Sequence, residues 1–203
     1  MQPQSPLLVL AAFILTLAGV AAEAQTTAVR VRGSVTGFDG HVLAVKTREG
    51  KDVGINLAET FTVLGVAATS MAEIKPGSFI GAAAMQGKDG RLVALEVLVF
   101  PESARGSNEG HYPWDLQPES NMTNATVAAS VDGNDGKELT LTYKGGQQRI
   151  LVPQGIPIVT FVPADKSLLA PGAQVFVPTQ LAADGSMSAA RVLVGKDGIK
   201  PPM

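Results

Sequence analysis

The chain contains no cysteine, and this absence excludes several classes of protein at once. Without thiols it can form no disulfide framework, no Cys-ligated zinc or iron–sulfur site and no thiol-based catalytic centre. Histidine and aromatic residues are also scarce, with two His, one Trp and two Tyr in 203 residues. Positive charge is not in excess, because 16 Lys and Arg are balanced by 18 Asp and Glu. Affinity for nucleic acids comes mainly from cations that neutralise phosphates, so this balance argues against a nucleic-acid partner.

One long apolar run is present, and it lies at the start of the chain. Leu7–Ala22 is almost entirely apolar or small and leads into Ala22-Glu23-Ala24, the A-x-A pattern that signal peptidase cleaves. The run is shorter than the ~20 residues that a membrane-spanning helix needs, and no later stretch approaches that length. We therefore predict a signal peptide over residues 1–24, cleaved after Ala24. The remaining chain is expected to be periplasmic or secreted, with no membrane span.

The rest of the sequence contains one pattern twice. Ser34–Gly40 matches Ser130–Gly136 at most positions. Two dipeptides then recur in the same order: Pro76-Gly77 with Pro171-Gly172, and Asp89-Gly90 with Asp184-Gly185. Identities at turn residues, repeated in order, predict an internal duplication.

Each copy has the pattern of three strands, a short helix and two strands. In the first copy, apolar residues alternate with polar or small ones over Val29–Val35, Val42–Thr47 and Val53–Leu57, the period of half-buried strands. Ser70–Glu73 has the form of a capping box, which predicts a short helix that ends at Pro76-Gly77. The further strands expected are Phe79–Met85 and Leu92–Phe100, then Val127–Val131, Leu139–Tyr143, Arg149–Val152, Gln174–Pro178 and Ser188–Val194, with a second helix near Asp165–Leu169.

This order of elements is that of the OB-fold, a small five-stranded Greek-key barrel. We predict an all-β protein of two tandem OB-like barrels, at residues 25–100 and 125–203, joined by a linker over residues 101–124. Closing each barrel would remove the edges that short strands otherwise expose. A pair of open β-sandwich halves is the alternative.

The linker is the least generic part of the chain. It is far longer than a typical connection of ~4–6 residues, and it gathers His111, Tyr112 and Trp114 with Asp115 close behind. Aromatic residues in a linker favour burial, so these side chains are expected to fix the linker between the barrels or to offer a platform to a ligand. We take the four residues as the candidate site for a ligand or partner.

Five segments resemble a family of exported alphaproteobacterial proteins with an OB-like domain of unknown function. They are Arg48–Val53, Ile74–Gly77, Gly110–Pro118, Asn121–Thr126 and Gly195–Met203. The resemblance spans most of the chain after residue 24 and implies an OB-like fold and an exported protein. Members are often labelled metal ABC transporter permease, but a permease needs several membrane spans, which this sequence lacks. The resemblance therefore implies no activity.

No catalytic motif stands out, so the sequence favours a non-enzymatic binding module of the cell envelope. Its partner would be an envelope protein, a peptide or a glycan, and no cofactor is expected. One alternative is an accessory protein of a metal uptake system, with His111, Asp115 and Glu109 as ligands. A second is an envelope hydrolase that uses a carboxylate pair drawn from Asp52, Glu59, Glu96 and Glu138. These strand carboxylates are otherwise expected to be solvated on outward faces.

Overall fold

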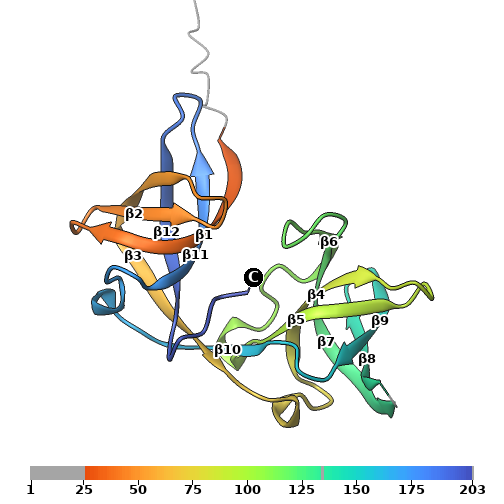
Figure 1. Cartoon of the computed structure of the whole chain (residues 1–203). Coiled ribbons are helices and arrows are strands. Elements are labelled where there is room, and N and C mark those ends of the chain that lie inside the picture. Colours follow the sequence, from red (N-terminus) through yellow and green to blue (C-terminus); the bar gives the residue numbers. More distant parts are fainter. Residues whose placement is uncertain (1–25, 134, 203) are drawn as a thin grey trace, which may run out of the picture.

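The computed structural model describes residues 26–133 and 135–202, which form an all-β, OB-like fold in two lobes (Figure 1). This confirms the predicted fold class. The predicted signal peptide, residues 1–24, lies outside the described residues. No helix in the described part of the chain is both long and apolar enough to cross a membrane.

The described residues contain twelve strands and three 3₁₀ turns. The strands are β1 (Thr27–Phe38), β2 (Val42–Thr47), β3 (Asp52–Ala68), β4 (Phe79–Gln86), β5 (Leu92–Val99), β6 (Gly110–Pro113), β7 (Asn121–Gly133), β8 (Gly136–Tyr143), β9 (Gly146–Pro153), β10 (Ile158–Pro163), β11 (Gln174–Leu181) and β12 (Met187–Gly195). The turns are η1 (Met71–Glu73), η2 (Glu102–Ala104) and η3 (Lys166–Leu168). All ten predicted strands are present, while β6 and β10 were not predicted.

The strand pairings close two rings of five strands each. The first ring runs β1-β2-β3-β12-β11 and returns to β1, with β3 and β12 parallel and the other neighbours antiparallel. The second ring runs β7-β8-β9-β5-β4 and returns to β7, with β5 and β9 as its parallel pair. Both rings therefore have the same strand order and the same single parallel pair, and closure leaves neither with an open edge.

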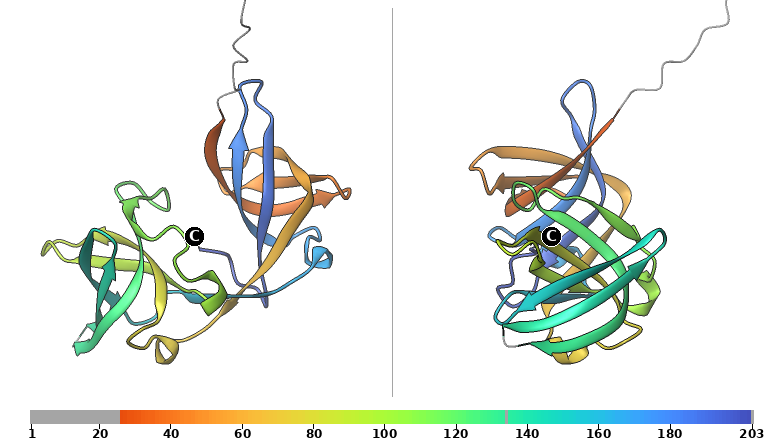
Figure 2. Two further views of the ribbon diagram at one scale, coloured as in Figure 1. Left: turned by 180° about the vertical axis from the view of Figure 1, so that it is seen from behind. Right: turned by 90° about the vertical axis from the view of Figure 1, so that its right-hand side faces the viewer.

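The predicted domain boundaries are wrong, because each ring takes strands from both halves of the chain. The first ring joins β1–β3 to β11 and β12, and the second joins β4 and β5 to β7–β9. The physical reason lies in β3, which continues to Ala68 instead of ending near Leu57. It carries the chain into the other lobe, and β10 returns antiparallel beside it, with Val66 opposite Phe161 (Figures 1 and 2).

Three apolar clusters fill the molecule, one inside each ring and one between them. The first ring is filled mainly by Val, Leu and Ile, and the second uses more Ala. The cluster between the rings, here called the junction core, consists of buried Val66, Leu98, Val159, Phe176 and Leu193, with Phe100, Trp114, Phe161 and Ile199 packed against it. Both halves of the chain therefore supply each cluster.

The two predicted helices are single 3₁₀ turns. The Ser70 side chain makes no capping hydrogen bond at η1, so the predicted capping box is absent. At η3 the Asp165 carboxylate does accept a hydrogen bond from the Ser167 N–H, at 2.8 Å. A stretch of three residues between two strands is too short to complete an α-helical turn with its own hydrogen bonds.

The predicted linker is ordered over most of its length. Residues 101–124 contain η2, β6 and the first residues of β7, and β6 pairs antiparallel with β7 from Gly110 opposite Asn124 to Pro113 opposite Asn121. β6 therefore extends the outside of the second ring as a short edge strand. The residues that follow it turn toward the first ring.

Candidate functional site

Trp114 lies where the two rings meet, directly after β6. The guanidinium carbon of Arg30 is 4.0 Å from the centre of the Trp114 ring, and that of Arg32 is 6.0 Å away. Both arginines come from β1 of the first ring, where their i, i+2 spacing places them on one face of the strand. A cation over an indole face is attracted by the ring quadrupole, so Trp114 binds the linker to the first ring.

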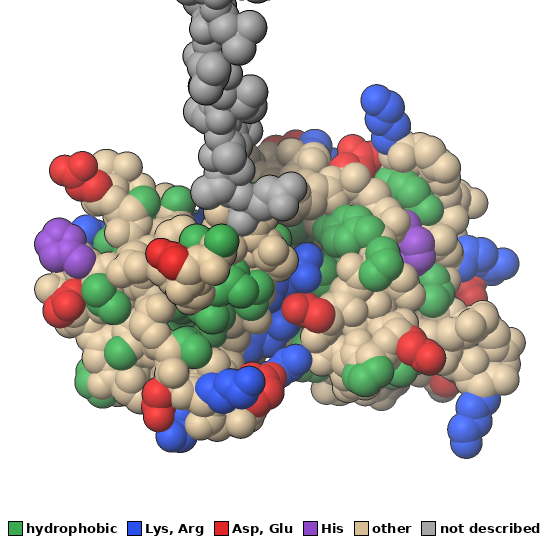
Figure 3. Space-filling model, turned by 90° about the horizontal axis from the view of Figure 1, so that it is seen from above, with side chains coloured by type: hydrophobic (Ala, Val, Ile, Leu, Met, Phe, Trp, Pro, Cys, Tyr) green, Lys and Arg blue, Asp and Glu red, His purple; other side chains and the backbone are tan. Residues whose placement is uncertain are grey.

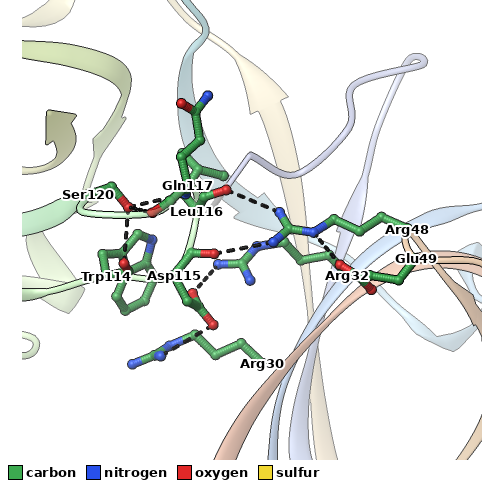
Figure 4. A network of polar contacts seen from close by, with 9 residues as sticks. All are labelled: Arg30, Arg32, Arg48, Glu49, Trp114, Asp115, Leu116, Gln117 and Ser120. Carbon is green, nitrogen blue, oxygen red and sulfur yellow. Dashed lines mark hydrogen bonds and ion pairs between the residues drawn. The ribbon is translucent and has the colours of Figure 1, made fainter.

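Asp115 completes this contact with an ion pair to the same two arginines (Figure 4). Its carboxylate oxygens lie 2.8 Å from Arg32 Nη2 and 3.5 Å from Arg30 Nη1. Arg48 donates to the main-chain carbonyls of Asp115 and Leu116, at 3.2 and 3.4 Å. Partial burial raises the pKa of Asp115, but the Arg32 hydrogen bond and the two positive charges outweigh it, so the pKa lies below its usual value.

A tight turn from Trp114 to Ser120 presents these two side chains. The Trp114 N–H donates to the Ser120 carbonyl at 2.7 Å, and the Ser120 hydroxyl lies 3.0 Å from the Trp114 carbonyl oxygen. The Gln117 N–H donates to that hydroxyl at 3.2 Å. Glu119 has a φ of +63°, a left-handed conformation that side chains other than glycine adopt only at some cost. The hydrogen bonds between Trp114, Gln117 and Ser120 fix the conformation of the turn.

Glu96 on β5 faces this junction from the second ring. Its side chain is only 1% exposed, and its Oε2 has no hydrogen-bond partner among the described residues. Burial raises the pKa of Glu96 to about 8, against the opposing effect of the Arg32 charge. The expectation that strand carboxylates are solvated is therefore wrong for Glu96. Lys and Arg side chains gather in the hollow between the two lobes (Figure 3).

Tyr112 and Asn124 form a second polar contact near Trp114. The Asn124 amide donates to the Tyr112 hydroxyl at 3.1 Å and to the Ser107 carbonyl at 3.1 Å. The Tyr112 and Trp114 rings meet edge to face, with centroids 6.1 Å apart. Of the four residues predicted as the ligand site, Tyr112, Trp114 and Asp115 thus contact one another or the first ring, and their contacts fix the linker.

His111 faces a different direction. Its Nδ1 lies 2.8 Å from the Thr123 hydroxyl, and its ring is stacked on Tyr143 with centroids 6.4 Å apart and planes 24° apart. His111 also lines an open cleft of about 620 Å³ on the second ring. The other lining residues are Met85, Gln86, Gly90, Leu92, Glu119, Asn121 and Gln148.

The predicted metal ligands do not converge. Asp115 is paired with the arginines of β1, while Glu109 accepts a hydrogen bond from the Lys144 N–H at 2.8 Å. His111 is held by Thr123. Nowhere in residues 26–133 and 135–202 do three or more His, Asp or Glu side chains form a group that could hold a metal ion.

The sequence interpretation did not name Arg30, Arg32 or Asn124, and it expected Glu96 to be solvated or part of a carboxylate pair. A signal was present for three of these positions. Arg30 and Arg32 alternate with core residues on β1, so they share its outer face. Glu96 is the one charged residue in the otherwise apolar strand Leu92–Val99. Because Glu is almost never fully buried without a partner, its place in an otherwise apolar strand is the signal of an unusual environment.

The chain matches no protein-family model, no curated protein and no solved structure in comparisons with each.

Proposed function

We propose that this chain is a non-enzymatic binding module of the cell envelope, exported to the periplasm or secreted, and that it holds its ligand in the cleft beside His111. The N-terminal signal pattern supports export, as does the resemblance to exported proteins with OB-like domains. The partner would be a glycan, a peptide or an envelope protein.

The observation that carries this proposal is the cleft together with its unused hydrogen-bonding groups. Its volume of about 620 Å³ lies in the range of small-molecule sites, roughly 300–1,000 Å³. The side-chain amides of Gln86 and Gln148 line it, and neither has a hydrogen-bond partner in the cleft among the described residues. Polar groups that converge on a hollow without partners favour binding of a polar ligand.

The docked linker supports the same role by fixing one wall of the cleft. His111 and Glu119 line the cleft, and the residues between them are tied to the first ring through Trp114 and Asp115. Because this wall is already fixed, less conformational entropy is lost when a ligand binds.

The distribution of carboxylates supports binding over hydrolysis. Glycoside hydrolysis by the usual mechanism needs two carboxyl groups on either side of the bond that breaks. Glu119 is the single carboxylate that lines the cleft, and the strongly perturbed Glu96 lies enclosed at the junction.

Native mass spectrometry of the chain recovered from its own host's envelope tests this proposal. We expect the mass of residues 25–203 plus a non-covalent ligand in the wild type. The double variant Gln86→Ala, Gln148→Ala should be recovered without that added mass. A bare chain in both samples, or an equal added mass in both, would contradict binding in this cleft.

A further inference from the structure

We propose that the cleft beside His111 binds a neutral oligosaccharide; this inference rests on the proposed function and specifies its ligand. It follows from three properties of the cleft: the kind of polar groups present, the near absence of charge, and the exposed apolar and ring surfaces beside them.

The polar groups of the cleft are mostly carboxamides. Gln86, Asn121 and Gln148 each present an amide that can both donate and accept hydrogen bonds. Asn121 uses one donor locally, toward the Glu119 carbonyl at 3.3 Å. A sugar hydroxyl is likewise a donor and an acceptor, so each amide can bond to a sugar hydroxyl in either direction.

The charge of the cleft argues against ionic ligands. No Lys or Arg is among its lining residues, whereas phosphate and carboxylate ligands are recognised by such cations or by helix N-termini. Glu119 is the single charged lining residue, and one carboxylate does not make a cation site. A neutral ligand needs neither a Lys or Arg side chain nor a group of carboxylates for its recognition.

The remaining lining supplies apolar contact. Met85 and Leu92 offer aliphatic surface, and the His111 ring is backed by Tyr143. The two faces of a pyranose ring carry C–H groups while its rim carries hydroxyls, so a sugar can place its faces on such surfaces and its rim on the amides. Ligand sites of this mixed kind use apolar walls for affinity and a few polar groups for orientation.

The strand next to the cleft disfavours an extended peptide. A peptide that adds to a sheet needs a row of free main-chain N–H and C=O groups on an edge strand. β6 is the edge strand at this site, but it has four residues and ends in Pro113, which has no N–H. We therefore favour the oligosaccharide over the peptide.

The test is an NMR titration of ¹⁵N-labelled residues 25–203 with chitotetraose, cellotetraose and maltotetraose, beside an acetylated, amidated tetra-alanine peptide. We expect at least one of the sugars to shift amide signals of β4, β6 and β9 around the cleft. The double variant Gln86→Ala, Gln148→Ala should weaken that sugar about tenfold or more, since it removes two hydrogen-bonding side chains. Gln147→Ala is the matched control, because Gln147 neighbours Gln148 on β9 but does not line the cleft, and its affinity should equal that of the wild type.

The outcomes separate this inference from the proposed function. Binding of the peptide but of none of the three sugars, at the same amides, would overturn the oligosaccharide and leave a binding module. A sugar whose affinity the double variant and the Gln147→Ala control change equally would also overturn it. If no probe shifts the cleft signals, and the chain from the host envelope carries no added mass, both proposals fail.

Discussion

The junction and the cleft are two polar regions built from one short segment of chain, and they differ in how completely their polar groups are used. At the junction, Asp115 and Trp114 are engaged by arginines of the first ring, and Arg32 is only 8% exposed. At the cleft, a few residues away, Gln86 and Gln148 line an open hollow. Paired and buried charges hold a conformation, whereas unpaired and accessible groups remain available to a ligand. Under the proposed function, the junction holds the fold and the cleft binds the ligand.

Removing the Arg32 guanidinium from the junction should have the largest destabilising effect on the unfolding free energy. Arg32→Ala removes the ion pair with Asp115, the positive charge that acts on Glu96, and the contact of the guanidinium with the Phe176 ring, whose centre lies 4.9 Å away. The guanidinium is buried but its partner Asp115 is 47% exposed, so we expect the lost charge-assisted hydrogen bond and ring contacts to lower the unfolding free energy by about 2–3 kcal/mol. Urea unfolding measures this. Arg191→Ala on β12 is the control, since Arg191 is exposed, and it should stay within about 0.5 kcal/mol of the wild type.

The pH dependence of stability should reveal the buried Glu96. Its pKa is about 8 in the folded protein and near 4.5 when solvated. The folded state thus binds this proton more tightly, so the stability it contributes is complete below pH 4.5 and is lost as the pH rises toward 8.

Glu96→Gln keeps the neutral form at every pH and should remove this loss. Its unfolding free energy should exceed that of the wild type by about 3–4 kcal/mol more at pH 8 than at pH 5. Equal pH profiles for the two proteins would show that Glu96 is not held neutral by burial.

Trp114→Ala should have the next largest effect. It deletes a partly buried ring from the junction core and the cation–π contact with Arg30, for a loss of about 2 kcal/mol. Hydrogen exchange of residues 114–120 should accelerate, and small-angle scattering should show a less compact molecule. Tyr112→Phe removes only the hydroxyl that Asn124 contacts, so it should leave both the exchange and the scattering close to those of the wild type.

Substitutions in the cleft should have the smallest effect on stability. Gln148→Ala removes a side chain that has no hydrogen-bond partner within the described residues, so we expect a change in unfolding free energy below about 0.5 kcal/mol. Thermal melting with circular dichroism measures it. A loss comparable to that of Trp114→Ala would mean that the cleft side chains support the fold, and the contrast with the junction would disappear.

The strands could be predicted because their signals are local. Alternating apolar residues and Asp-Gly turns define β1, β2, β4, β5 and their counterparts wherever those strands pair. The sequence could not show which ring the β4–β5 hairpin joins. The hairpin buries the same face whether it closes against β1–β3 or against β7–β9. That choice depends on how far β3 runs before the chain turns, which rests on pairing with β10 more than ninety positions away.

The candidate site could likewise be predicted only where its signals are local. Trp114 and Asp115 could be singled out because an aromatic and acidic cluster in a long connection is unusual, yet their partners on β1 are set by tertiary structure. His111 was grouped with them by sequence position. β6 places it toward Thr123 and the cleft instead, since neighbouring residues on a strand point to opposite faces.

The central claim is that each ring needs strands from both halves of the chain, and one cut tests it directly. A protease site inserted between Gly106 and Ser107, both exposed, would separate β1–β5 from β6–β12 after cleavage. The account predicts that the two fragments stay together without denaturant and elute at the size of the intact chain. Two fragments that separate as independently folded proteins, divided as residues 25–100 and 125–203 would be, would contradict it.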